Sequence, residues 1–496
     1  MDKNIIRIHP EDSVCVVLTP VPKGERLSFG EGSVVTGEEI PAGHKVAIQP
    51  IRPGEDVLKY GYPIGRANQP IQPGDWVHTH NLETKLQGTM TYPYRKEESS
   101  APRRNKSGRT FRGYVREDGN VGIRNEIWVL NTVGCVNKTA ELLARTAHQA
   151  FAGDGLDGVY HFPHPYGCSQ LGDDLKNTQR VLASLAKHPN AAGVLVIGLG
   201  CENNHIASFR EVLGPVDERR VKFLAVQEVN DELDEGMKLL EELSREAKTM
   251  KRETVPLSKL VVGLKCGGSD GLSGITANPL VGTLADRVVA EGGAALLTEV
   301  PEMFGAEEIL LGRAADEEVF QQTVNLVNGF KEYFLNHGQP VSENPSPGNK
   351  EGGITTLEEK SLGCIQKGGY SPVTDVLEYG ERVRKQGLQL VQGPGNDLVS
   401  VTTLATAGAQ LVLFTTGRGT PYGGPVPTLK ISTNSKLYRN KQNWIDFDAE
   451  PVLEQREAVE EALFDEVVRI ASGEKQTRNE THGFREIAIF KDGVTL

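Results

Sequence analysis

The chain has 496 residues, with 54 Lys and Arg against 66 Asp and Glu, so its formal net charge is −12. At roughly 150 residues per domain, this length corresponds to about three domains. The acidic balance argues against a nonspecific nucleic-acid binder, and no run of about 18 consecutive apolar residues predicts a transmembrane helix. We therefore expect a globular protein with neither a nucleic-acid nor a membrane partner.

The six cysteines are spread along the chain, and the first residues have no signal-peptide pattern. Such cysteines are typical of thiols or metal ligands in a reducing compartment rather than of a disulfide framework. The sequence therefore predicts a cytoplasmic protein. A homodimer is expected only because such assemblies are common.

Residues 1–92 predict a small β-rich domain. The segments SVCVVLTP, HKVAIQPI and DWVHTHN have strand length and strand composition, and Pro-Gly pairs separate them. Residues 93–113 are polar, charged and interrupted by Pro and Gly, which is typical of a linker. Its basic run could contact nucleic acid, but a solvated linker fits the acidic whole better.

From residue 114 onward, buried strands alternate with helices, which predicts an α/β part with mainly parallel sheets. In the first half, 114–250, the segments NEIWVLNTVG, AGVLVIGLG and VKFLAVQE are expected strands, with helices at 137–152, 172–188 and 230–248. In the second half, 251–496, the expected strands are LVVGLK, AALLTEV, LQLVQGPG and QLVLFTTGRG, with helices near 316–336 and 451–472.

Four cysteines follow predicted strands, each beside a glycine: Cys135, Cys168, Cys201 and Cys266. Because the carboxyl ends of parallel strands line one crevice, these thiols could converge in space. They could instead be small buried hydrophobic residues, as free cysteines often are. No CxxC pair indicates a zinc ribbon.

Three further motifs also follow predicted strands. The glycine-rich segment 265–279 predicts a nest of backbone N–H groups for an anion, or else a tight turn, and its candidate residues are Lys265, Gly267, Gly268, Ser269, Asp270 and Asn278. Glu299 and Glu302 suit metal binding or acid–base chemistry, or else a helix start. Arg418, followed by Thr420 in a glycine loop, could clamp a carboxylate or pair with a carboxylate of the chain.

Histidines and one polar loop complete the candidates. His44 opens a strand after a turn, and His164 lies among residues at a strand end. His78 and His80 share one face of a strand and could bind metal, although exposure is the simpler interpretation. Asn349 and Lys350 belong to the rigid, hydrogen-bond-rich segment ENPSPGNK.

At these motifs the sequence resembles the altronate/galactarate dehydratase family. The matching segments span nearly the whole chain and include GHKVAI, KYGYPIG, VHTHN, TVGCVN, YGCSQLGDD, VIGLGCENN, LKCGGSDGLSGITANP, LTEVPEMFGAE, ENPSPGNKEGGITTLE and FTTGRGTPYGG. VHTHN places the chain on the altronate side of the family. The resemblance implies a β-clip N-terminal domain of the SAF type and an α/β catalytic part. It also implies the dehydration of D-altronate to 2-keto-3-deoxy-D-gluconate in hexuronate catabolism, dependent on Fe(II), with Mn(II) as an alternative.

This chemistry suggests roles for the candidates. His44 or His164 would act in acid–base catalysis or as a metal ligand, and Glu299 and Glu302 are alternative bases. Arg418 and the 265–270 segment would hold the substrate carboxylate, and Asn349 and Lys350 its hydroxyls.

The metal could be a single Fe(II) ion or a [4Fe–4S] cluster on the strand-end thiols. The candidate ligands are His44, His164, Cys135, Cys168, Cys201 and Cys266. Two other functions stay open: galactarate dehydratase or a related hydroxy-acid lyase, and a non-catalytic sugar-acid binding protein.

Overall fold

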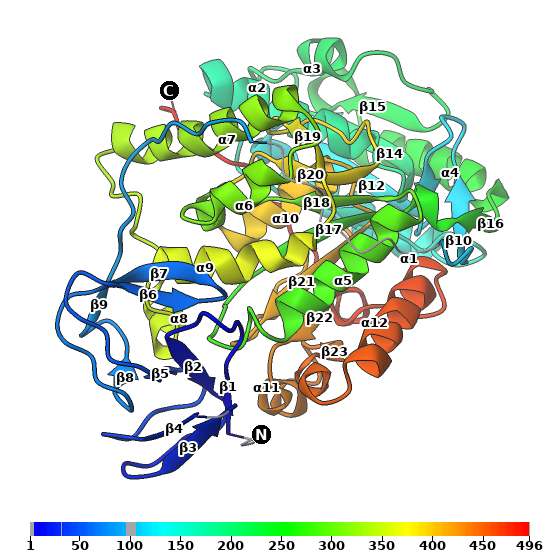
Figure 1. Ribbon diagram of the computed structural model, residues 1–496. Coiled ribbons are helices and arrows are strands. Elements are labelled where there is room, and N and C mark those ends of the chain that lie inside the picture. Colours follow the sequence, from blue (N-terminus) through cyan, green and yellow to red (C-terminus); the bar gives the residue numbers. More distant parts are fainter. Residues whose placement is uncertain (1–3, 31, 96–105, 496) are drawn as a thin grey trace.

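The computed structural model describes residues 4–30, 32–95 and 106–495 (Figure 1). An N-terminal part of short antiparallel strands is followed by two parts, each built on a parallel sheet. The α/β fold class with a small β-rich N-terminal domain is therefore confirmed.

The N-terminal part contains three small sheets, with the orders β1-β2-β5-β8, β3-β4 and β6-β7-β9. The described residues of this part form no helix. Its strands are β1 (Ile5–Ile6), β2 (Val14–Val17), β3 (Arg26–Phe29), β4 (Gly32–Val35), β5 (Lys45–Ala47), β6 (Asp56–Lys59), β7 (Tyr62–Ala67), β8 (Trp76–Val77) and β9 (Leu82–Glu83).

The predicted linker 93–113 is only partly described, because residues 96–105 lie outside the described ranges. Its last residues are not linker, since β10 begins at Thr110. The strand β10 (Thr110–Val115) pairs antiparallel with β11 (Val121–Gly122) and with β16 (Glu253–Pro256). This small sheet joins the start of the second part to the start of the third.

The second part is a four-stranded parallel sheet with the order β13-β12-β14-β15. All residues of β14 are buried, as expected for a strand covered on both faces. The helices predicted at 137–152, 172–188 and 230–248 correspond to α1, α2 and α4. The elements are β12 (Glu126–Asn131), α1 (Asn137–Phe151), β13 (Gly158–His161), α2 (Gly172–Ala186), β14 (Ala191–Gly198), α3 (Ile206–Leu213), β15 (Val221–Ala225) and α4 (Glu232–Thr249).

The third part is a seven-stranded parallel sheet with the order β19-β20-β18-β17-β21-β22-β23. Its strands are β17 (Val261–Cys266), β18 (Ala294–Leu297), β19 (Val373–Leu377), β20 (Gly387–Val391), β21 (Leu411–Thr416), β22 (Thr428–Ser432) and β23 (Phe447–Asp448). Its helices are α5 (Ala277–Ala290), α6 (Glu307–Gly312), α7 (Glu317–Asn336), α8 (Pro347–Glu351), α9 (Leu357–Cys364), α10 (Asp397–Thr406), α11 (Ser435–Asn440), α12 (Arg456–Ala471) and α13 (Arg478–His482).

Each parallel sheet has a point where the strand order reverses. From β17 the chain passes to β18 on one side, whereas β21 lies on the other side; from β12 it passes to β13, whereas β14 lies on the other side. Ligands of open α/β sheets bind at the carboxyl ends of the strands at such a point. The fold therefore provides two crevices for chemistry, one in each sheet.

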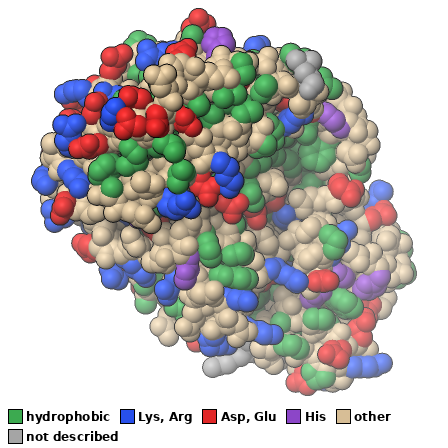
Figure 2. Space-filling view, turned by 180° about the vertical axis from the view of Figure 1, so that it is seen from behind, with side chains coloured by type: hydrophobic (Ala, Val, Ile, Leu, Met, Phe, Trp, Pro, Cys, Tyr) green, Lys and Arg blue, Asp and Glu red, His purple; other side chains and the backbone are tan. Residues whose placement is uncertain are grey.

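Apolar cores connect the three parts. One core joins the N-terminal strands to α5, α7 and α12, and a second joins α2 of the second part to α10 of the third. Figure 1 shows α9 between the N-terminal part and the large sheet. None of the helices in the described ranges is long and apolar enough to cross a membrane. On the face in Figure 2, basic and acidic side chains are interspersed.

Candidate functional site

The crevice of the seven-stranded sheet is formed by the loops that follow β17, β18, β20 and β21. Gly267, just after β17, donates its backbone N–H to Thr415 of β21 at 3.0 Å. A Cβ at Gly267 would lie 2.4 Å from the Phe414 ring and 2.7 Å from the Asp397 carboxylate. Only glycine therefore fits where these loops meet.

Lys265 lies at the centre of this crevice. Its ammonium contacts the Glu299 carboxylate, lies 3.0 Å from Asp397, and donates to the Gly395 carbonyl at 3.2 Å. Lys265 and Glu299 are almost completely buried, whereas the Asp397 side chain is 32% exposed. The cluster thus runs from the protein interior to the rim of the crevice.

Two more lysines neutralise the buried carboxylates. Lys367 lies 3.1 Å from Glu299, and Lys360 lies 2.8 Å from Glu302. Lys360 also donates to the Asn344 side-chain oxygen at 3.0 Å. Buried charges are costly unless they are paired, so the lysines and carboxylates of this cluster depend on one another for their stability in the interior.

Two buried thiols belong to the same cluster. Cys364 donates to Glu302 at 3.0 Å, and the Cys266 sulfur lies 2.8 Å from the Ser269 hydroxyl. The interaction between the two thiols lowers the pKa of Cys266 well below that of an ordinary thiol and raises the pKa of Cys364. Cys266 is therefore the member of the pair that ionises first.

The two predicted carboxylates differ in pKa. Burial raises the pKa of Glu299 to about 7, against the opposing effect of Lys265 and Lys367. Burial alone would also raise the pKa of Glu302, but Lys360 and the other lysines lower it to about 2. Two neighbouring carboxyls pushed apart in pKa are typical of sites that divide acid and base roles.

Glu299 also has an unusual backbone. Its φ of 69° and ψ of 52° place it in the left-handed region, which residues other than glycine rarely adopt. It directly precedes the 3-10 helix η4 (Val300–Met303), of which Glu302 is part. Such strain concentrates at functional sites, where the surrounding structure holds it in place.

The exposed rim holds the residues that can meet a ligand. Arg418 is exposed, lies 3.1 Å from Glu351, and its backbone N–H donates to Gly268 at 3.0 Å. Lys350, in α8, is half-buried, and its ammonium has no partner among the described residues. Below the rim the cavity beside Cys364 has a volume of only about 10 Å³. A sugar acid therefore does not fit beside the buried thiols.

Several residues of the predicted anion nest have structural roles instead. The buried Asp270 side chain accepts hydrogen bonds from the hydroxyls of Ser273 and Thr433 and from the N–H of Leu272. Hydrogen-bond donors of this loop are therefore occupied by a carboxylate of the chain itself. These bonds give Asp270 a structural role in the loop, and its part in holding a substrate carboxylate stays a prediction. Asn278 is buried and bonds Gly363 and Thr415, and Asn349 bonds Ser269. The hydroxyl of Thr420 accepts from the Tyr422 N–H.

The N-terminal part is fastened beside this crevice by buried charges. Lys45 and Lys59 each lie 2.8 Å from Glu359 of α9, and all three side chains are at most 1% exposed. Lys45 also donates to Gly353 and Thr355, each at 2.8 Å. The Gly43–Gly353 backbones are so close that a Cβ on Gly353 would lie 2.4 Å from the Gly43 oxygen.

His44 lies in this interface with both ring nitrogens engaged. Its Nδ1 accepts from Trp76 at 3.1 Å, and its Nε2 faces the Glu351 carbonyl at 3.2 Å. Its ring is 5.0 Å from that of His78, which contacts the Thr355 hydroxyl at 3.0 Å. Burial lowers the pKa of His78 to about 4. His80 packs at the edge of Trp76.

His164 is also committed to structure. It is 3% exposed, its Nε2 lies 2.7 Å from the Asn131 carbonyl, and its Nδ1 accepts from the Tyr166 N–H at 3.2 Å. Burial lowers its pKa to about 4. His44 and His164 belong to different parts of the chain, and the ring nitrogens of each contact protein groups. The acid–base or metal role suggested for either histidine stays a prediction.

The predicted convergence of four thiols is wrong for one of them. Cys266 is buried at the crevice of the large sheet, whereas Cys135, Cys168 and Cys201 follow strands of the four-stranded sheet and are exposed. Sequence spacing could not show that the strands belong to two sheets. Among the described residues, no three His, Cys, Asp or Glu side chains lie close enough to hold a single metal ion.

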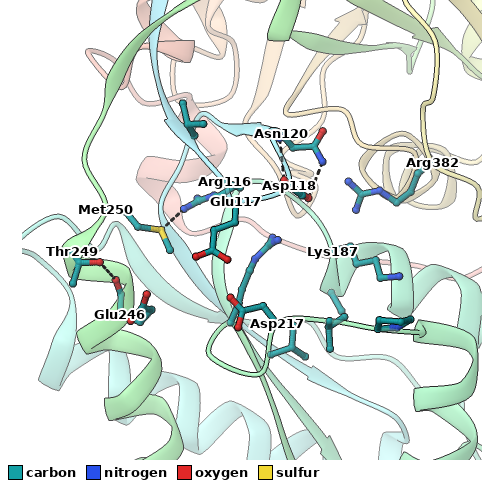
Figure 3. A pocket seen from close by; sticks show the side chains of 16 residues that line it. Arg116, Glu117, Asp118, Asn120, Lys187, Asp217, Glu246, Thr249, Met250 and Arg382 are labelled. Carbon is teal, nitrogen blue, oxygen red and sulfur yellow. Dashed lines mark hydrogen bonds between the residues drawn. The ribbon is translucent and has the colours of Figure 1, made fainter.

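The pocket in Figure 3 lies at the opposite, amino end of the four-stranded sheet. Its volume is about 550 Å³, and Arg116, Asp118, Lys187 and Arg382 are among its lining residues. Arg116 donates to the carbonyls of Pro189 and Arg124, so it connects loops. We therefore do not place the reaction here.

Sequence reasoning missed several charged or thiol residues of the crevice and its interface. Among these are Lys45, Lys59, Glu359, Lys360, Cys364, Lys367 and Asp397. Each lies far along the chain from the partner that it contacts. None of them belongs to a glycine-rich loop after a strand except Asp397, which follows the GPGN turn at the start of α10. That turn was the one available signal.

Comparison with known proteins identifies the class to which this fold and site belong. The chain matches the profiles described as "Altronate/galactarate dehydratase SAF domain" over residues 3–85, "D-galactarate dehydratase/Altronate hydrolase, second domain" over 113–248, and "D-galactarate/Altronate dehydratase, C-terminal" over 257–495. The chain belongs to the altronate/galactarate dehydratase family.

Individual relatives show which members of the family the chain resembles more. The chain is 52% identical to an altronate dehydratase of Bacillus subtilis over 100% of both chains, and 50% identical to an altronate dehydratase of Escherichia coli over 99% of both. It is 32% identical to the galactarate dehydratase (L-threo-forming) of Escherichia coli, over 98% of this chain and 96% of the relative. The resemblance predicted from the motifs is confirmed.

Proposed function

We propose that the protein is a hydro-lyase that converts D-altronate into 2-keto-3-deoxy-D-gluconate and water in hexuronate catabolism. The observation that carries the proposal is the identity of about 50% over the full length with altronate dehydratases from two bacteria, against 32% with the galactarate enzyme. The crevice adds the chemistry that such a reaction needs.

The reaction breaks the C2–H and C3–O bonds. The C2 proton is weakly acidic because it is α to a carboxylate, and hydroxide is a poor leaving group. The site must therefore supply a base, an acid, and positive charge for the enediolate that develops on the substrate carboxylate. Loss of water leaves an enol, which becomes the 2-keto acid by tautomerisation.

The residues at the rim divide these tasks. Arg418 and Lys350 hold the substrate carboxylate and a hydroxyl, since both cations face the exposed side of the crevice. Asp397 takes the C2 proton, because it is the carboxylate of the lysine–carboxylate cluster that is partly exposed. The buried Lys265 ammonium lies 3.0 Å from Asp397 and is a positioning residue that holds this carboxylate in place.

Glu299 and Glu302 are positioning residues in this proposal. At 1% and 4% exposure they do not reach a ligand at the rim, although the sequence suggested them as bases. Glu299 instead holds Lys265 in place and sets its charge.

Iron dependence is part of the proposal, since the resemblance implies Fe(II) and iron supplies Lewis-acid chemistry to a hydroxyl or carboxylate. A single-ion site on His44 and His164 does not fit, because the ring nitrogens of both imidazoles contact protein groups. We propose a cytoplasmic location, in keeping with six free thiols, and a homo-oligomer because such assemblies are common.

The test is turnover of purified protein on D-altronate and galactarate, followed by 2-keto acid formation under anaerobic conditions with ferrous ion. We expect kcat/KM for altronate to exceed that for galactarate. Asp397→Asn and Lys265→Met should lower kcat by about 10²–10⁴-fold. Turnover of galactarate alone, or stabilisation by altronate without turnover, would contradict the proposal.

A further inference from the structure

The four-stranded sheet carries an unusual set of thiols at its own strand-order reversal. Cys135 follows β12, Cys201 follows β14, and Cys168 follows β13 on the other side of β12. All three thiols are exposed, whereas the remaining three cysteines of the chain are buried. Free cysteines are among the most buried residue types, so exposure of three at one sheet edge needs an explanation.

Hydrogen bonds fasten the three thiol-bearing loops to one another. The N–H of Gly134, next to Cys135, donates to the Tyr166 carbonyl at 2.8 Å. The N–H of Asn204, in the loop of Cys201, donates to the carbonyl of Gly167, next to Cys168, at 2.9 Å. The loop of Cys168 therefore lies between the other two and contacts both.

The contact between the second and third loops is doubled by a side chain. Ser169 donates its backbone N–H to the Asn203 side-chain oxygen at 2.8 Å and has a φ of 60°, in the left-handed region. A Cβ on Gly167 would lie 1.9 Å from the Thr132 carbonyl. The backbone is thus held in strained, closely packed conformations on both sides of Cys168.

The carboxylate that directly follows Cys201 in the sequence already has partners. Glu202 accepts from the Thr132 hydroxyl at 2.7 Å and from the N–H groups of Leu199 and Gly200 at 3.0 and 2.6 Å. It pins the loop of Cys201 rather than facing a ligand. The three exposed thiols are the soft donors that these loops present, and Cys201 accepts only a long contact of 3.8 Å from the Gln227 side chain.

We infer that Cys135, Cys168 and Cys201 ligate an iron–sulfur cluster. Soft thiolates select such clusters. The described residues hold no group suited to a single ion, but in a cluster each thiolate binds a different iron, so the sulfurs need not meet at one point. With three thiolates, one iron of a four-iron cluster has no cysteine ligand and is open to an oxygen donor.

The thiol-bearing edge of the four-stranded sheet lies near the crevice of the large sheet, which gives the cluster a role in the reaction. That role rests on the proposed function. A pocket of about 310 Å³ is lined by Asp173 and Lys176, in the first turns of α2 just after the loop of Cys168, and by Gln392, Gly393 and Pro394 after β20. The latter loop leads directly to Asp397 at the rim of the large crevice. The two strand-end crevices are therefore neighbours on one side of the molecule.

The test is the iron and acid-labile sulfide content of full-length protein purified anaerobically, before and after reconstitution with ferrous ion and sulfide. We expect iron and sulfide in equal amounts, about four of each per chain, together with visible thiolate-to-iron absorption. Cys135→Ser, Cys168→Ser and Cys201→Ser should each lose most of both. The control Cys15→Ala removes a buried thiol of the N-terminal part and should keep both.

Alkylation gives a readout that does not depend on activity. Mass spectrometry should show the three thiols protected from iodoacetamide in the reconstituted protein and modified after chelation. Iron without sulfide, no cluster after reconstitution, or a triple Ser variant that retains the cluster would overturn the inference. Altronate turnover by cluster-free protein would overturn its role and leave the proposed function standing. A cluster without turnover would overturn the proposed function, and with it the cluster's role, but would leave the cluster itself standing.

Discussion

The interface between the N-terminal part and α9 contains two buried ammonium groups and one buried carboxylate, and this imbalance predicts how much each variant destabilises the protein. Lys45 and Lys59 each lie 2.8 Å from Glu359, and this trio is buried. At an effective dielectric constant of about 20, each contact supplies about 6 kcal/mol of Coulomb attraction. The cost of removing each ion from water, several kcal/mol, offsets most of it.

Glu359→Gln leaves two buried ammonium groups without a carboxylate, and should therefore lower the free energy of unfolding by about 3–5 kcal/mol. Lys59→Met leaves one neutral Lys45–Glu359 pair and should cost only about 1 kcal/mol, despite removing a partner of the same carboxylate. Urea titrations of the two variants and the wild type, followed by circular dichroism, measure both values.

The same trio predicts an acid transition. Burial alone would raise the pKa of Glu359, but Lys45 and Lys59 lower it to about 2, below the ordinary value of 4.5. Its contribution to stability is therefore present above about pH 4.5 and is lost as the pH falls towards 2. Glu359→Gln should lose less stability over this interval. The reasoning is refuted if Glu359→Gln and Lys59→Met are equally destabilising, or if Glu359→Gln matches the wild type.

Three further predictions concern the crevice. Burial raises the pKa of Glu299 to about 7 against the effect of neighbouring lysines, so its contribution to stability should fall as the pH rises from about 4.5 to 7; thermal melts of Glu299→Gln should show a smaller fall, and an equal slope would count against this. Arg418→Met and Lys350→Met should each raise KM for altronate about tenfold or more while changing the free energy of unfolding by under about 1 kcal/mol; unchanged steady-state kinetics would exclude the rim as the binding site. Gly267→Ala should destabilise by about 1–3 kcal/mol because its Cβ meets a buried ring at 2.4 Å, whereas Gly329→Ala in α7, with no atom within 4 Å, should be neutral or slightly stabilising in urea titrations.

The strands and helices of the two parallel sheets were predictable because their signals are local. The apolar run before Cys266 and the run before Gly417 become β17 and β21, since buried parallel strands have near-continuous apolar composition. The helices predicted near 316–336 and 451–472 correspond to α7 and α12. The end of the linker was not predictable, because β10 is a strand only through its pairing with β16, which lies far along the chain.

The sequence by itself determined the fold class, the family, and the segments at which chemistry is placed, because glycine-rich strand ends and long motifs are written in consecutive residues. Only the tertiary structure decided the partners. It separated Cys266 from Cys135, Cys168 and Cys201 by placing their strands in two sheets. It also brought Lys360 and Lys367 of one segment to the carboxylates of another. Ion pairing and burial depend on distance in space, and a sequence specifies that distance only through the fold.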